Sequence, residues 1–165
     1  VAGKAWDMAK MKEILSRIIQ RYGAQLIFNY SRIEKEAALA LYEDMGKDEH
    51  IFIDIEADSL RKLVSMLEIA DFFFGNEGGP RHIAQACHLP SLAIYPPWVE
   101  LPKWLPSNDL CYQGVTPFDM FPDQVIEGRT EKEMFDLLTV EYVWERLQPM
   151  MDKVFIDCAF VSNKK

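Results

Sequence analysis

Long apolar runs and basic side chains are both scarce in this sequence. No apolar run approaches the roughly 20 residues of a membrane-spanning helix, so we expect at most peripheral association with a membrane. Lys and Arg number 18 against 26 Asp and Glu, for a net charge of -8. Because gripping a nucleic acid backbone needs clustered basic side chains, this charge argues against a nucleic acid partner. A bound phosphate would have to be held by a local site.

Cysteine is scarce as well. The three cysteines, at positions 87, 111 and 158, are odd in number and lack CxxC spacing. This pattern favours reduced thiols in a cytoplasmic protein over a disulfide framework. His82, Cys87 and His88 are spaced poorly for one helical face, so the sequence predicts no metal site there.

Short, solidly apolar segments are plentiful, and they alternate with amphipathic ones. The spacing predicts strands at 24–30, 51–55, 72–75 and 91–95, with a further strand at 110–115. It predicts helices at 8–22, 33–45, 60–67, 80–88 and 140–154, and another after Thr130. Apolar strands with a helix in each gap are typical of a parallel sheet covered on both faces. The predicted class is α/β, with a Rossmann-like, doubly wound sheet.

Local signals mark where several of these helices begin and end. Gly23 and Gly46 are expected to end the first two helices, and Asp58 or Ser59 to cap the third. Thr130 begins a capping-box pattern, and Thr139 is placed to cap the last helix. Residues 114–129, beyond the strand at 110–115, are expected to be irregular.

The turn "GNEGGPRHIA" (75–84) follows the third predicted strand and opens a helix. In a doubly wound sheet the ligand crevice lies at the carboxyl ends of the strands. Glycine permits close approach of a ligand and positive φ, and Pro80 suits a first helical position. The uncovered helix amides would favour a diphosphate, with His82 as a further donor. The alternative is a merely sharp turn, with His82 a helix-face residue.

A resemblance makes the ligand-binding interpretation more specific. Residues 71–84, "DFFFGNEGGPRHIA", resemble the pattern D-(apolar)3-G-N-D-S-G-P-x-H-(apolar)-A of the lipopolysaccharide heptosyltransferases, glycosyltransferase family 9. Segments 4–15, 58–71, 87–106 and 138–151 resemble further family motifs in the same order. By this resemblance the chain is identified as a member of that family over nearly its whole length.

The resemblance implies a fold and a domain organisation. Residues 1–165 would form a single nucleotide-sugar-binding domain, the C-terminal half of a GT-B glycosyltransferase. The N-terminal acceptor domain, and the first strand of this domain, would be absent from the chain. Because the family's catalytic base lies in that other domain, no catalytic residue is expected here, and the fragment alone is expected to be inactive.

The resemblance also implies which residues bind the donor. Lys4 matches a lysine that neutralises the donor phosphate, and Glu34, with Ser31 in the same turn, matches an acid on the ribose or base side. Ala57 and Asp58 would lie beside the base. The diphosphate would be bound at the turn formed by Asn76, Glu77, Gly78, Gly79 and Pro80, with His82 nearby. The simpler interpretations are that Lys4 is a solvated charge and Glu34 part of an exposed helix face.

The implied partners follow from the family. They are a nucleoside diphosphate sugar, ADP-heptose or similar, and a lipid-linked saccharide acceptor reached through the missing domain. No metal or other cofactor is required, and the location would be the cytoplasm or the inner face of the bacterial inner membrane.

The sequence departs from the family at two places. Glu77-Gly78 replaces Asp-Ser, and Pro96-Pro97-Trp98 replaces Gly-Pro-Thr, so that Trp98 would pack over the crevice or in the core. Two alternatives stay open. One is a nucleotide-sugar epimerase of the same architecture. The other, suggested by the first change, is a catalytically silent nucleotide-binding or assembly module.

Overall fold

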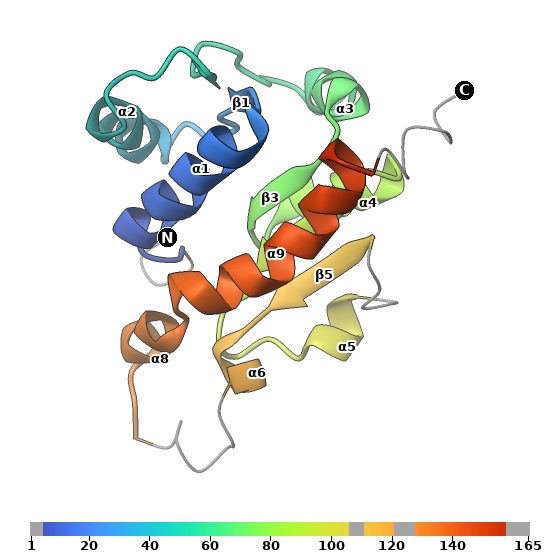
Figure 1. The fold of residues 1–165 in the computed structure, drawn as a ribbon. Coiled ribbons are helices and arrows are strands. Elements are labelled where there is room, and N and C mark those ends of the chain that lie inside the picture. The colour runs from blue at the N-terminus through green and yellow to red at the C-terminus, as the bar shows by residue number, and fades with distance from the viewer. Residues whose placement is uncertain (1–4, 106–110, 121–127, 158–165) are drawn as a thin grey trace. The chain divides into compact units, whose positions relative to one another are not determined.

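A computed structural model describes residues 5–105, 111–120 and 128–157. The chain divides into two compact units. Figure 1 shows the ribbon, coloured by residue number. The small unit is Met8–Leu63, and the large unit is Val1–Asp7 with Val64–Lys165.

The small unit contains two helices and two short strands. They are α1 (Met8–Tyr22), β1 (Leu26–Ile27), α2 (Lys35–Asp44) and β2 (Ile51–Phe52). The strands pair in parallel, with Leu26 opposite Ile51, and are shorter than the expected 24–30 and 51–55. Gly23 ends α1 at φ 59 and donates its N–H to the carbonyl of Ile19, as expected of a helix-ending glycine.

The large unit is built on a three-stranded parallel sheet. In chain order its elements are β3 (Phe73–Asn76), α4 (Gly79–Ala86), β4 (Ser91–Ile94), α5 (Leu101–Trp104) and β5 (Tyr112–Val115). β4 is the central strand, with Gly75 and Gly114 opposite Ala93 on either side. Helix α3 (Leu60–Ile69) precedes β3, and Ser59 Oγ accepts the Lys62 N–H at its start. The α/β class with parallel strands is confirmed.

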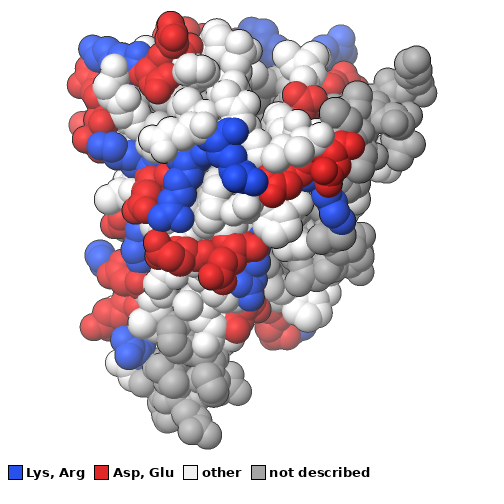
Figure 2. Space-filling view, in the orientation of Figure 1, with Lys and Arg blue, Asp and Glu red and all other residues white. Residues whose placement is uncertain are grey.

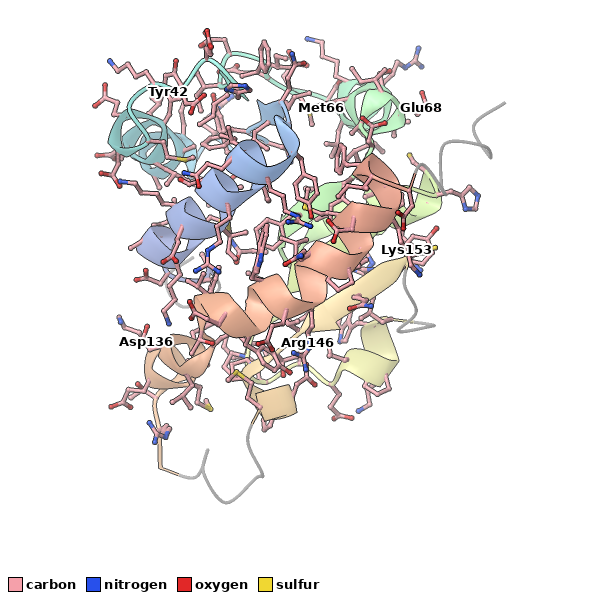
Figure 3. The ribbon with its side chains drawn as sticks, in the orientation of Figure 1. Tyr42, Met66, Glu68, Asp136, Arg146 and Lys153 are labelled. Atoms are coloured by element: carbon pink, nitrogen blue, oxygen red, sulfur yellow. The ribbon has the colours of Figure 1, made fainter. Side chains whose placement is uncertain are left out.

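The C-terminal part of the large unit is helical. It contains α6 (Pro117–Met120), α8 (Glu131–Leu137) and α9 (Val140–Phe155), and α9 passes in front of the sheet in Figure 1. The capping box of Thr130 with Glu133 and the cap of α9 by Thr139 are both confirmed. Arg146, labelled on α9 in Figure 3, stacks its guanidinium 3.4 Å from the centroid of the Tyr142 ring.

The expectation that residues beyond 115 are irregular was wrong at α6. Thr116 Oγ1 accepts the Phe118 N–H at 2.9 Å, and Asp119 Oδ2 accepts the Thr116 N–H at 3.0 Å. These reciprocal bonds satisfy two amides at the helix start, and Pro117 suits its first position. Burial raises the pKa of the Asp119 carboxyl, partly offset by that bond and by the charge of Arg146.

A cluster of buried side chains lies around the end of β4. It consists of Ala93, Tyr95 and Leu105. A Cβ placed on Gly114 would lie 2.7 Å from the Tyr95 ring and 2.8 Å from both Leu101 and Leu105. A side chain at position 114 would therefore force Tyr95, Leu101 and Leu105 to shift, because they fill the space that a Cβ would need.

Candidate functional site

The turn between β3 and α4 leaves two backbone amides uncovered. The Glu77 N–H donates to the carbonyl of Ile94 at 2.7 Å, which continues the strand pairing one residue beyond β3. The Arg81 N–H donates to the carbonyl of Gly78, and Pro80 has no N–H. Within the described residues no acceptor faces the amides of Gly78 and Gly79, and no side chain caps α4. These two N–H groups are the positive end of the helix dipole.

The space around the two glycines is open to an incoming ligand. A Cβ on Gly79 would meet no described atom within 4 Å, and one on Gly78 would meet only Pro80 Cδ, at 3.8 Å. Neither glycine has the left-handed conformation, so the positive φ that glycine permits is not used at Gly78 or Gly79. Protein packing and backbone strain therefore do not explain glycine at these positions, and close approach of a ligand remains as a reason.

His82 and Glu77 lie together beside these amides. Their Nε2 and Oε1 atoms are 3.7 Å apart, and their side chains are 43% and 21% exposed. The His82 ring lies 5.7 Å from the ring of Trp104, tilted by 54°. The turn therefore combines amide donors, an imidazole and a carboxylate within one small surface of the large unit.

Arg81 lies directly behind this surface and is fully buried. Its Nη1 donates to Gln85 Oε1 at 2.6 Å, and its Nη2 donates to the carbonyl of Trp104 at 3.3 Å and contacts His82 Nδ1. Its Nε has no hydrogen-bond partner among the described atoms. The guanidinium carbon is 5.9 Å from the centroid of the Tyr95 ring. Burial, opposed by the nearby charge of Arg81, raises the pKa of the Tyr95 phenol to about 12.

Our sequence interpretation did not single out Arg81. A signal was present, because Arg81 and Ala84 are three residues apart, and both are buried residues of the amphipathic α4. An arginine on the buried stripe of a helix beside a predicted anion site indicates a polar role, since arginine is rarely buried without partners.

In the small unit, Ser31 and Glu34 lie together after β1. The N–H and Oγ–H of Ser31 both donate to Glu34 Oε2, at 2.9 and 2.5 Å. These bonds, the hydroxyl's first, lower the pKa of the Glu34 carboxyl. The described residues give the second carboxylate oxygen of Glu34 no hydrogen bond.

The segment after β2 comes close to this turn. Lys35 Nζ pairs with Glu56 Oε1 at 2.6 Å, and the Tyr30 hydroxyl donates to the carbonyl of Ile53. Ala57 follows as a half-buried residue, and the exposed Asp58 pairs with Lys62 at 2.8 Å.

The remaining predicted site residues are placed as follows. Asn76 ends β3, and its side-chain Oδ1 accepts the Trp6 N–H at 3.0 Å. Pro80 occupies the first turn of α4. Lys4 lies outside the described residues. Trp98 is 44% exposed, so it is not in the core.

Charges of both signs are interspersed on the face drawn in Figure 2. Among residues 5–105, 111–120 and 128–157 there is no group of three or more His, Cys, Asp or Glu side chains placed to hold a metal ion. Within the same ranges, no helix has the length and apolar character needed to cross a bilayer.

Comparison with known proteins identifies the family. The model of glycosyltransferase family 9 (heptosyltransferase) matches residues 2–105. The chain belongs to glycosyltransferase family 9. The match includes the turn of Gly78 and Gly79 and the turn of Ser31 and Glu34. No curated protein matches the chain.

Two solved structures share the fold of this family 9 chain. The ADP-heptose LPS heptosyltransferase II of E. coli superimposes with a TM-score of 0.69 at 18% identity, covering 90% of this chain and 42% of that one. A glycosyl transferase family 9 protein of Veillonella parvula superimposes with a TM-score of 0.69 at 14% identity. That match covers 92% of this chain and 43% of the other. The chain thus spans less than half the length of either protein.

Proposed function

We propose that residues 1–165 form the donor-binding domain of a glycosyltransferase. The full protein would transfer a heptose-like sugar from a nucleoside diphosphate sugar to a lipopolysaccharide-type acceptor. The family membership supports the reaction class. The observation that carries the assignment of the site is the pair of uncovered amides at Gly78 and Gly79.

The chemistry of the reaction explains why such amides matter. As the glycosidic bond breaks, negative charge develops on the departing nucleoside diphosphate. Donors that are already oriented towards the phosphate oxygens stabilise that charge without reorganisation. In an acidic domain, two main-chain amides at a helix N-terminus supply positive potential without an added basic side chain on the surface.

The family pattern assigns the contacts with the nucleoside to Ser31, Glu34 and Ala57. Glu34 has an oxygen available to accept a ribose hydroxyl, while Ser31 holds the other oxygen. Ala57 would contact the base, and Lys4 would neutralise a phosphate. These roles come from the family pattern, and each is open to substitution.

A second candidate is a nucleotide-binding module without catalysis. It is favoured by Glu77-Gly78, which replaces the family's Asp-Ser and so removes one hydroxyl donor. The carboxylate of Glu77 also lies beside the amides that would bind the anion.

Calorimetry with ADP, UDP, GDP and their sugars tests the proposal. We expect one nucleoside diphosphate to bind, with a further gain in affinity for its sugar conjugate. Binding of the nucleotide without discrimination of its sugar would favour the silent module. Absence of binding to all three nucleotides would overturn the proposal.

Gly79→Val locates the binding site. Its side chain would enter open space, so the fold should tolerate it, whereas a diphosphate held by the amides would be displaced. We expect binding to be lost while the urea midpoint is retained. Ser65→Val, on the exposed part of α3, is the matched control and should bind normally. If Gly79→Val bound the nucleotide with unchanged affinity, the binding site would not be at this turn.

A further inference from the structure

The buried guanidinium of Arg81 has an unusual set of partners. It contacts Gln85 Oε1, the carbonyl of Trp104 and His82 Nδ1, none of which carries a negative charge. A fully buried cation normally pairs with a carboxylate, because desolvation of an unpaired charge is costly. Among the described residues, the guanidinium therefore makes hydrogen bonds to neutral groups and no ion pair.

The contact with His82 determines the state of the imidazole. Arg81 Nη2 lies 2.5 Å from His82 Nδ1 and 3.3 Å from Nε2. Arginine has only donors, so the nearer nitrogen must accept. A neutral imidazole that accepts at Nδ1 carries its proton on Nε2. A proton on Nδ1 would instead bring two donors together.

The Nε2 atom of His82 faces the carboxylate of Glu77. Nε2 is 3.7 Å from Glu77 Oε1, and the His82 side chain is 43% exposed. A neutral Nε2–H has a single proton, which can be donated to a phosphate oxygen in place of the Glu77 carboxylate. An Nδ1–H tautomer would present a lone pair at Nε2, which would repel a phosphate oxygen.

We propose that Arg81 is a positioning residue that fixes His82 as the neutral Nε2–H tautomer, so that His82 acts as a hydrogen-bond donor in the anion site. The tautomer follows from the unliganded geometry alone. Its use in binding a diphosphate rests on the proposed function. Tyr95 and Trp104 supply the remaining aromatic surroundings of this pair, and Glu77 is the carboxylate facing His82.

Long-range 1H–15N correlation spectra of the 15N-histidine-labelled chain, at mildly alkaline pH, test the tautomer. The sequence has three histidines, so His82→Ala assigns the signal. His50 is an internal reference of the opposite kind, because its Nδ1 lies 2.8 Å from the Asp48 carboxylate and must donate. We expect Nε2–H for His82 and Nδ1–H for His50. An Nδ1–H signal from His82 would overturn the proposal.

Arg81→Met removes the donor while keeping apolar bulk. Replacing a buried unpaired charge by an apolar side chain is often tolerated, and thermal unfolding will establish that the variant is folded. We expect His82 to become a mixture of tautomers in Arg81→Met and to keep the Nε2–H form in Arg81→Lys. An unchanged tautomer in a folded Arg81→Met would refute the positioning role.

A double-mutant cycle on ADP affinity separates this inference from the proposed function. Arg81→Met should weaken binding about twofold, because only about half of the His82 side chains would then carry the proton on Nε2. In the His82→Ala background the same change should have no further effect. An equal loss in both backgrounds would show that Arg81 does not act through His82. If the parent chain binds none of ADP, UDP and GDP, the proposed function fails, and the tautomer spectra still decide the role of Arg81. If it binds UDP or GDP in place of ADP, the cycle is measured with that nucleotide.

Discussion

The side-chain oxygen of Asn76 accepts the backbone N–H of Trp6 at 3.0 Å, across 70 positions of sequence. The indole N–H of Trp6 in turn donates to the carbonyl of Leu138 at 3.0 Å, and the Trp6 side chain is only 1% exposed. Trp6 therefore joins the end of β3 to the segment between α8 and α9.

Removing the acceptor should loosen this connection. Asn76→Ala leaves the half-buried Trp6 amide without its partner, and we expect a loss of about 1 kcal/mol in the free energy of unfolding. Asn76→Asp keeps an oxygen at the same place and should recover most of that loss. Urea unfolding followed by tryptophan fluorescence measures both variants. If Asn76→Ala instead loses nucleotide binding at unchanged stability, the side chain serves the ligand and not Trp6.

Gly114→Ala should be destabilising for a packing reason. The added methyl would lie under 3 Å from Tyr95, Leu101 and Leu105, which are themselves packed together. Overpacking of this kind costs about 1 to 3 kcal/mol. Gly79→Ala is the matched control, since its methyl meets no described atom and a helix start tolerates alanine. Equal stability of the two variants in urea would contradict the packing argument.

Ser31→Ala should change the titration of Glu34. The hydroxyl of Ser31 is the largest cause of the lowered pKa of the Glu34 carboxyl, so its removal should raise that pKa towards 4.5. A 13C titration of the glutamate carboxyls measures the shift. Ser59→Ala, in which another helix loses its first-turn hydroxyl, is the control and should leave the pKa of Glu34 in place.

Glu133 gives a prediction for acid stability. Hydrogen bonds from Thr130, the backbone bond first, lower the pKa of the Glu133 carboxyl from 4.5. A carboxyl with a lowered pKa in the folded state stabilises the fold above its unfolded pKa and loses that effect as the pH falls through the folded value. The stability difference between the parent chain and Glu133→Gln should therefore be constant near neutral pH and shrink below pH 4.5. If the stability difference between the parent chain and Glu133→Gln grew on acidification, the predicted direction of the pH dependence would be wrong.

Much of the fold could be predicted because its signals are local. The apolar stripe of α1, the Thr130 capping box and the solid apolar run of β4 each depend on a few neighbouring residues. Strand length was predicted less well, since β1 covers only Leu26–Ile27 and its extent depends on pairing with β2. The short α6 was missed although Thr116 and Asp119 have the spacing of a capping box. A helix of only four residues, Pro117–Met120, is too short to show an apolar periodicity in the sequence.

The candidate site was predictable where it consists of backbone. The glycines and the proline of the turn predicted which backbone amides would be uncovered. In the structure, the amides of Gly78 and Gly79 have no acceptor among the described residues. The partners of Arg81 could not be predicted, because the Trp104 carbonyl reaches it from a helix 23 positions away. Sequence patterns record side-chain types, and they carry no signal for a main-chain oxygen used as an acceptor.

The bond from Arg81 to the carbonyl of Trp104 implies how this part of the molecule can vary during evolution. Every amino acid offers the same oxygen, so exchanges of the indole at position 104 would leave that bond available. An insertion or deletion between β4 and α5 would instead carry the oxygen out of reach. In this segment, selection should act on the number of residues more strongly than on their identity.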